Sequence, residues 1–172
     1  MSTSTSSSPA EATKLLVGVG DLKLSTDHCA EIVTFALGSC VGVTVYDPSK
    51  CVGGLLHAML PQSKLACQEN AKPEMFVDTG VPELFRRCYE LGAEKHNLIV
   101  CVAGGACRLA DHDGDLFKIG QRNVEMARAL MEINCVNVQA WDVGGTHART
   151  LVLSLPSGRV YTRSGVEEKS LT

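Results

Sequence analysis

The stretch that decides the fold, residues 41–59, reads VGVTVYDPSKCVGGLLHAM. Its first part, 41–46, alternates and is rich in β-branched residues, which is typical of a strand. Residues 47–50, Asp-Pro-Ser-Lys, are a turn signal, because proline favours the second position of a type I turn. Residues 52–59 return as a second strand, so the stretch predicts an antiparallel hairpin.

A loop that is symmetric about Pro48 and Ser49 would pair residues whose numbers sum to 97, which places Cys40 opposite His57. Directly opposite residues of an antiparallel pair have Cβ atoms roughly 4.5–5.5 Å apart and point to the same side. This register gathers the valines of the first strand on one apolar face and leaves Cys40 and His57 on the other. One extra loop residue would move His57 to the wrong face.

A cysteine facing a histidine matters because a thiol is a poor nucleophile until it loses its proton. A neighbouring imidazole can take that proton and later give it to a departing amine or ammonia. Gly38 and Ser39, just before Cys40, suit a tight turn that exposes the sulfur and lets backbone N–H groups approach an oxyanion. Cys40 and His57 are therefore a candidate nucleophile and base, and the alternative interpretation is an ordinary core pair.

The rest of the chain predicts a mixed α/β domain, a single layered domain of mixed and antiparallel sheets with two main helices. The evidence is short apolar runs for the strands and apolar residues at helical spacing for the helices. The predicted elements are strands at 15–19, 32–35, 98–102 and 136–141, helices at about 74–91 and 122–133, and a hairpin of 150–155 with 160–163.

The composition is that of an ordinary globular protein, with 172 residues of which 45% are hydrophobic and 20% charged. A net charge of −3 does not favour nucleic-acid binding, which needs a clustered basic face. No run of about 20 apolar residues predicts membrane insertion. Residues 1–13 are rich in Ser and Thr without an apolar core, so we interpret them as a disordered tail rather than a secretory signal. We expect one domain at 14–172, in a cytoplasmic protein.

Eight cysteines need an explanation, and no two have the C-x-x-C spacing of a structural zinc site. Without a secretory signal a disulfide framework has little support, so the default for each is a small buried hydrophobe. The acidic stretch 111–115 has no downstream Glu at EF-hand spacing and fits a solvated loop. The glycine-rich stretches 17–20 and 103–106 match no nucleotide-binding motif. We therefore expect neither a metal nor a cofactor.

Several motifs together resemble one known family, the chemoreceptor glutamine deamidases, CheD. They are ALGSC at 36–40, DP at 47–48, GG at 53–54, HAMLP at 57–61, AGGA at 103–106, IGQRN at 119–123 and DVGGTHAR at 142–149. The resemblance covers about residues 17–163, and the combination is specific although a Gly-Gly pair alone is not. One departure lies at 75–80, which reads Met-Phe-Val-Asp-Thr-Gly where the family usually has Lys-Tyr-x-Asp-x-Ala.

The resemblance implies an active site of Cys, His and Thr. Cys40 and His57 match the first two, and the family's Thr, six residues before the Cys, is Thr34. By likeness, Thr34 orients His57 through a hydrogen bond, as a third group does in other triads. The implied fold is a layered α/β one similar to the catalytic domain of deamidating bacterial toxins, so any likeness to papain-like proteases would be convergent.

The activity implied by the resemblance is hydrolysis of specific glutamine side chains on methyl-accepting chemotaxis receptors, giving glutamate and ammonia through a Cys thioester. The implied partners are the cytoplasmic helices of those receptors. The alternative is a non-catalytic chemotaxis module that regulates a CheC-type phosphatase. A thiol redox sensor is a weaker interpretation, because Cys51 would lie at the far end of the hairpin from Cys40.

Overall fold

The structure, a computed structural model, describes residues 13–65, 71–107 and 118–172. Residues 1–12 of the predicted tail and the acidic stretch 111–115 lie outside the described residues, and Thr13, the last residue of the predicted tail, belongs to the first strand instead. The strands are β1 (Thr13–Val17), β2 (Asp21–Ser25), β3 (Ala30–Leu37), β4 (Val41–Asp47), β5 (Val52–Ala58), β6 (Ile99–Gly104), β7 (Ala140–Val143), β8 (Arg149–Ser154), β9 (Arg159–Ser164) and β10 (Glu167–Ser170). Helix α1 (Val77–Glu90) lies between β5 and β6 in the chain, and helix α2 (Lys118–Ile133) lies between β6 and β7. Three 3₁₀ turns, η1 (Ser63–Leu65), η2 (Pro73–Met75) and η3 (Lys95–Asn97), precede and follow α1.

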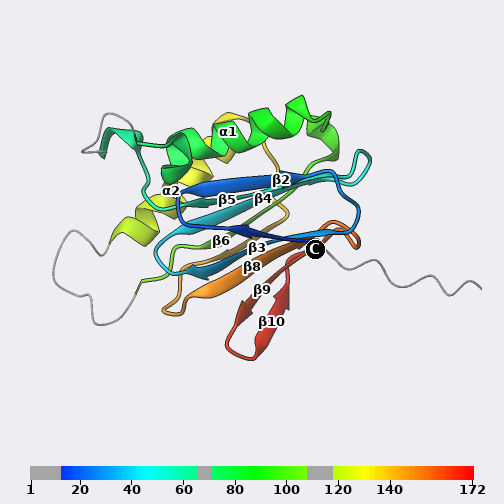
Figure 1. Cartoon of the computed structure of the whole chain (residues 1–172). Coiled ribbons are helices and arrows are strands. Elements are labelled where there is room, and N and C mark those ends of the chain that lie inside the picture. The colour runs from blue at the N-terminus through cyan, green and yellow to red at the C-terminus, as the bar shows by residue number, and fades with distance from the viewer. Residues whose placement is uncertain (1–12, 66–70, 108–117) are drawn as a thin grey trace, which may run out of the picture.

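The strands form two sheets that stack face to face. The outer sheet has the order β1-β3-β8-β9-β10, and the central sheet has the order β2-β5-β4-β6-β7. One face of the central sheet packs against α1 and α2, and its other face packs against the outer sheet, so the molecule has three layers (Figure 1). The predicted mixed α/β domain with two main helices is confirmed.

The 41–59 hairpin forms, but its loop is longer than the sequence predicted. β4 ends at Asp47 and β5 begins at Val52, and these two residues pair, so partner numbers sum to 99 rather than 97. His57 therefore lies opposite Gly42, and the prediction that it lies opposite Cys40 is wrong. Because the shift is two residues and side chains alternate with period 2, Cys40 and His57 still belong to one face.

The physical reason for the longer loop is the Asp47 side chain. Its Oδ1 accepts hydrogen bonds from the Ser49 N–H at 2.8 Å and the Ser49 hydroxyl at 2.7 Å. Its Oδ2 accepts the Glu94 N–H at 2.8 Å. The carboxylate thus organises a wider turn, and Cys51 closes that turn with a positive φ of 49°. The Asp-Pro pair correctly predicts a turn at this position, but turn propensity does not determine how many residues the loop contains.

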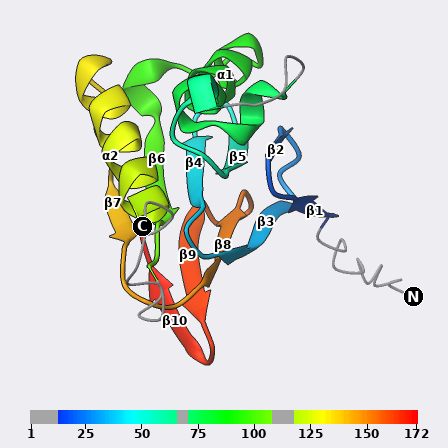
Figure 2. The same cartoon turned by 90° about the vertical axis from the view of Figure 1, so that its left-hand side faces the viewer.

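Helix α1 covers β4 and β5, with α2 beside it (Figure 2). Its buried residues recur at helical spacing, as the sequence predicted, and include Val81, Leu84 and Phe85. They pack on the valines of β4, which are fully buried on this side of the central sheet. The helix layer therefore fixes the position of the hairpin that carries His57.

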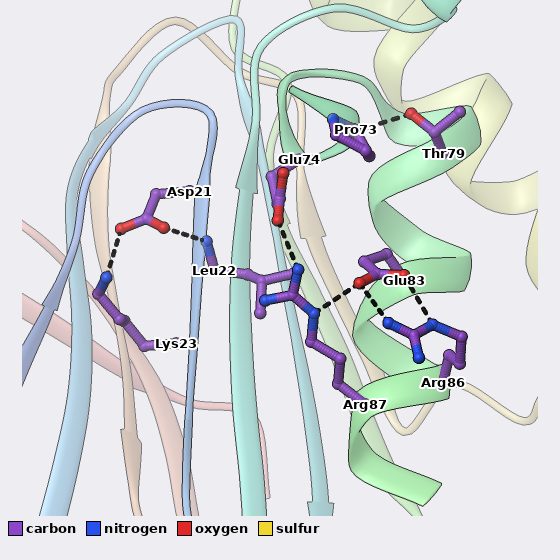
Figure 3. Close-up of polar contacts among 9 residues, drawn as sticks. All are labelled: Asp21, Leu22, Lys23, Pro73, Glu74, Thr79, Glu83, Arg86 and Arg87. Carbon is purple, nitrogen blue, oxygen red and sulfur yellow. Dashed lines mark hydrogen bonds and ion pairs between the residues drawn. The ribbon is translucent and has the colours of Figure 1, made fainter. Parts of the chain in front are cut away.

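Ion pairs link the second half of α1 to the segment before the helix. Glu83 accepts hydrogen bonds from Arg86 and Arg87, and Arg87 also reaches Glu74 at 2.9 Å (Figure 3). The hydrogen bonds from Arg86 and Arg87 lower the pKa of Glu83 to about 2. Arg87 therefore links the η2 turn to α1 through two carboxylates.

The sequence did not predict two of the ten strands found in residues 13–65, 71–107 and 118–172. β2 pairs with β5 as an edge strand of the central sheet, and β10 extends the outer sheet beyond β9. Every residue of β10 is exposed, so this strand has no apolar pattern from which to predict it. No helix within the described residues is long and apolar enough to span a membrane.

Candidate active site

The candidate site lies between the two sheets, where Thr34 of the outer sheet meets His57 of the central sheet. Thr34 Oγ1 is 2.7 Å from His57 Nδ1, and both side chains are buried, with exposed fractions of 0% and 1%. Thr34 lies in the middle of β3, flanked by β1 and β8, and His57 lies near the end of β5. The predicted hydrogen bond between these two residues is therefore present.

The partners of Thr34 determine which nitrogen of His57 carries the proton. Thr34 Oγ1 also lies 2.8 Å from the carbonyl oxygen of Val17, which can only accept a hydrogen bond. The single hydroxyl proton of Thr34 is thus donated to Val17, and His57 Nδ1–H must donate to the hydroxyl oxygen. The neutral imidazole consequently has its lone pair on Nε2. This is the tautomer that a general base requires.

Close approach of the sheets makes the Thr34–His57 contact possible. Gly42, the residue opposite His57, faces Leu37 and Leu151, and a Cβ at this position would lie 2.8 Å from a methyl carbon of each. A larger residue at position 42 would therefore push the sheets apart. The glycine lets the hydroxyl of Thr34 reach across the interface between the sheets.

Cys40 lies just before β4, two residues ahead of Gly42. It is half-buried and packs against the core between the sheets, the same side on which His57 and Thr34 lie. His57 Nε2 is buried and has no hydrogen-bond partner within the described residues. Cys40 and His57 therefore lie on one side of the hairpin end, and no described residue forms a hydrogen bond with His57 Nε2.

A β-bulge turns the chain from Thr34 toward Cys40. Between Thr34 and Leu37 the register of β3 against β8 shifts, and Ala36 has a positive φ of 56°. A non-glycine residue in this region is strained, and such strain concentrates at functional sites. The bulge lets Thr34 and Leu37 both point inward while the intervening Phe35 is exposed.

The segment 38–40 is held by the turn that follows β6. The N–H of Ala106 donates to the Gly38 carbonyl at 2.7 Å, and the N–H of Gly105 donates to the Cys40 carbonyl at 2.8 Å. Gly104 has a positive φ of 110°, and a Cβ there would lie 2.2 Å from the Cys40 carbonyl oxygen. Only glycine fits this close approach, which explains the AGGA sequence at 103–106.

Arg149 and Asp142 support the turn that follows β6. The guanidinium of Arg149 donates to the carbonyl oxygens of Gly104 at 3.3 Å and Gly144 at 2.7 Å. Asp142 lies 3.7 Å from the same guanidinium and also accepts hydrogen bonds from Thr162 and Lys169. These residues support the scaffold and do not contact Thr34 or His57.

Burial sets the protonation state of the candidate pair. Burial lowers the pKa of His57 to about 4, so the imidazole is neutral near pH 7. Burial raises the pKa of the Cys40 thiol, and an opposing contribution from its own backbone N–H is smaller. The resting site therefore holds a neutral thiol and a neutral imidazole.

The buried neutral His57 makes the stability of the fold depend on pH. Its pKa is lower in the folded than in the unfolded chain, so its contribution is complete above about pH 6.5 and is lost as the pH falls toward 4. We expect wild-type protein to lose about 2–3 kcal/mol more than a His57→Asn variant between pH 7.5 and 4.5. Urea unfolding of both proteins at each pH measures this difference, and equal losses would contradict it.

The expectation of a small buried hydrophobe holds for three of the other described cysteines. Cys51, Cys88 and Cys101 are buried in the core, whereas Cys29 is half-buried and Cys107 and Cys135 are exposed, so for these three the expectation is wrong. Cys67 lies outside the described residues. Burial raises the pKa of Cys88 to about 12 and that of Cys101 to about 11. Within the described residues, no cluster of three or more His, Cys, Asp or Glu side chains could hold a metal ion.

The sequence analysis did not predict the groups that hold the segment around Cys40. The carbonyl of Val17 and the N–H groups of Gly105 and Ala106 are backbone groups. Every residue type other than proline has both groups, so the sequence does not show which of them make contacts. Asn123, within the IGQRN motif, donates to backbone carbonyls on both sides of the site. The motif was visible in the sequence, but its contacts span more than sixty residues and no local pattern reports them.

Comparison with known proteins places this geometry in context. A family model described as CheD chemotactic sensory transduction matches residues 59–164. The chain is 44% identical over 151 residues to the "probable chemoreceptor glutamine deamidase" of Syntrophus aciditrophicus, covering 87% of this chain and 93% of that protein. It is 43% identical to a protein of the same description from Anaeromyxobacter dehalogenans, with the same coverage. A relative from Methanococcus maripaludis is 36% identical and covers 91% of this chain and 99% of its own.

Proposed function

Because the chain belongs to the CheD family, we propose that Cys40, His57 and Thr34 hydrolyse the side-chain amide of specific glutamines on methyl-accepting chemotaxis receptors. The relatives are named as chemoreceptor glutamine deamidases, which supports deamidation as the reaction. The observation that carries the assignment of residues is the hydrogen bond from His57 Nδ1–H to Thr34. It leaves the buried Nε2 free to act as a base on the side where Cys40 lies.

The first half of the reaction forms a thioester. His57 Nε2 takes the proton of the Cys40 thiol as the sulfur attacks the side-chain carbonyl carbon of glutamine. The carbonyl oxygen becomes an oxyanion in the tetrahedral intermediate. His57, now protonated, gives its proton to the departing nitrogen, and ammonia leaves. The product of this half is a γ-glutamyl thioester on Cys40.

The second half regenerates the thiol. Neutral His57 removes a proton from water as the water attacks the thioester carbonyl, and the sulfur leaves when the second tetrahedral intermediate collapses. The proton on His57 returns to the sulfur, and the receptor side chain is released as glutamate. Thr34 takes part in neither transfer, because its proton is committed to Val17. Its role is to keep the ring of His57 in one orientation.

The neutral resting pair suits a base that acts only when substrate is bound. A thiol whose pKa is raised by burial reacts little with other electrophiles near neutral pH. Substrate binding excludes water from the half-buried sulfur and brings the amide to it, so proton transfer and attack occur together. The enzyme therefore need not maintain a reactive thiolate between turnovers.

The surroundings favour a macromolecular substrate over free glutamine. The residues next to the catalytic pair in sequence are small or apolar, such as Gly42, Ala58 and Met59. Two exposed apolar side chains flank the groups that hold His57: Phe35 follows Thr34, and Val19 precedes Gly20, whose N–H donates to the His57 carbonyl. Such surfaces suit a receptor helix, whose contacts away from the reacting amide supply binding energy.

Ammonia release should be compared for a receptor cytoplasmic fragment, a glutamine-containing peptide and free glutamine. We expect kcat/KM for the receptor fragment to exceed that for free glutamine by at least about 100-fold, equivalent to about 2.7 kcal/mol of transition-state binding. Mass spectrometry of the fragment should show glutamine converted to glutamate in proportion to the ammonia. Comparable kcat/KM values for the fragment and free glutamine would leave a small-molecule amidase instead.

A non-catalytic role in regulating a CheC-type phosphatase is the second proposal that the family resemblance allows. The two roles separate in one experiment, because a Cys40→Ala variant removes the nucleophile while changing little of the binding surface. A protein that acts only by binding would regulate the phosphatase equally well with this substitution and would release no ammonia in either form.

A further inference from the structure

Asn123 joins the two halves of the candidate site through one amide group. Its Nδ2 donates to the Ser39 carbonyl oxygen at 2.9 Å and to the Met59 carbonyl oxygen at 3.0 Å. Ser39 immediately precedes Cys40, and Met59 lies two residues after His57. The Asn123 side chain is fully buried in α2. Both hydrogens of the amide are therefore used to hold the nucleophile segment against the strand that carries the base.

The contact with Ser39 fixes the direction of the next N–H group. The carbonyl of Ser39 and the N–H of Cys40 belong to one planar peptide unit, and no peptide bond within the described residues is cis. In a trans peptide the N–H points opposite to the carbonyl. Because Asn123 holds that carbonyl toward α2, the Cys40 N–H points away from α2. The Cys40 side chain also packs away from α2, against the core between the two sheets, whereas α2 packs on the opposite face of the central sheet.

The neighbouring carbonyls leave the segment little freedom to rotate. Those of Gly38, Ser39 and Cys40 are held in turn by Ala106, Asn123 and Gly105. The Cys40 N–H, by contrast, donates to no carbonyl among the described residues. A fixed donor beside the reacting sulfur is the arrangement that stabilises an oxyanion.

The Asn123 side chain has an unpaired buried oxygen, which destabilises the fold and which packing alone does not explain. Its Oδ1 is buried without a hydrogen-bond partner among the described residues. An unpaired buried acceptor destabilises a fold, and such groups in native structures call for a functional explanation. The amide is kept for its two donors, although its oxygen is left unpaired.

We propose that Asn123 is a positioning residue that orients the Ser39–Cys40 peptide so that the Cys40 N–H donates to the oxyanion of the tetrahedral intermediate. This inference rests on the proposed role of Cys40 as nucleophile. The proposal predicts that loss of Asn123 affects two reactions of the Cys40 sulfur differently. Acylation builds an oxyanion and needs the oriented N–H, whereas alkylation by iodoacetamide displaces iodide and builds none.

The test measures both reactions at Cys40 in wild-type protein and in Asn123→Ala. Acylation by p-nitrophenyl acetate and alkylation by iodoacetamide are followed across pH, with the modified Cys40 peptide quantified by mass spectrometry. We expect acylation and kcat for the receptor fragment to fall at least about 30-fold, toward the 10²–10³ that loss of an oxyanion donor costs. The alkylation rate of the thiolate and the KM should stay within about twofold.

Two further variants serve as controls. Asn134→Ala removes an exposed asparagine near the end of the same helix, whose Nδ2 donates only to the Leu130 carbonyl, and should leave both reactions unchanged. Asn123→Ser keeps a single hydroxyl donor and should show a smaller loss of acylation. If thermal melting shows that Asn123→Ala does not fold, Asn123→Ser carries the same comparison.

The outcomes separate this inference from the proposed function. Parallel losses of acylation and alkylation, or no loss of either, would overturn the orienting role of Asn123. Absence of ammonia release by the wild-type protein would instead contradict the proposed function. The comparison of the two small reagents needs no receptor, so it decides the role of Asn123 in either case.

Discussion

Cys40→Ala should abolish measurable deamidation of the receptor fragment, with a fall in kcat of at least about 10⁴-fold. The reason is that alanine offers no nucleophile in place of the sulfur that packs on the same side of the hairpin as His57. Ammonia release and receptor mass report the loss. Cys29→Ala, which removes another half-buried cysteine, is the matched control and should retain wild-type activity.

Cys40→Ala also separates catalysis from binding. Because the alanine is smaller and apolar, the receptor fragment should bind with unchanged or slightly higher affinity. A variant that lost activity and affinity together, or that melted well below the wild-type protein, would show a structural role for Cys40. Retained ammonia release in Cys40→Ala would rule out this sulfur as the nucleophile.

His57→Asn should lower kcat at least about 10²-fold while the fold stays intact, because a general acid–base group typically contributes 10²–10⁴. Asparagine is smaller than histidine and can still donate to Thr34, but it has no nitrogen that accepts a proton near neutral pH. The loss should appear in kcat, and KM should change little, because His57 is buried and acts on the bond being broken.

Thr34 provides the matched comparison for that result. Thr34→Val removes the hydroxyl but keeps the branched shape, so it should lower kcat less than His57→Asn does. Thr34→Ser retains the hydroxyl and should recover most of the activity. If Thr34→Val were the more damaging of the two at unchanged stability, the division of roles between base and orienting group would be wrong.

Sequence patterns were sufficient for the faces of the central hairpin but not for its register. Alternation in β4 placed its valines on the helix side and His57 on the other, and period 2 preserved that result when the loop proved two residues longer. The loop length depended on the side chain of Asp47, which binds Ser49 and reaches Glu94 far along the chain. Turn propensity carries no such long-range information.

For the candidate site, too, the sequence predicts some features and not others. The residue types of Cys40 and His57, and the family motif that adds Thr34, could be found in the sequence because catalysis constrains side-chain chemistry. Their mutual geometry could not, since it depends on a bulge at Ala36 and on the close approach of Gly42 to the outer sheet. The neutral state of the pair is likewise a consequence of burial, which no short motif encodes.

The most direct measurement is to quench the reaction with receptor fragment in acid and map the adducts on the protein by mass spectrometry. A thioester accumulates if its hydrolysis is slower than its formation, and rapid quenching then captures it during the first turnover. We predict a γ-glutamyl adduct on Cys40 that hydroxylamine removes and that is absent when glutamate replaces the target glutamine. Full ammonia release with a γ-glutamyl adduct on another cysteine and none on Cys40 would contradict this assignment of the nucleophile.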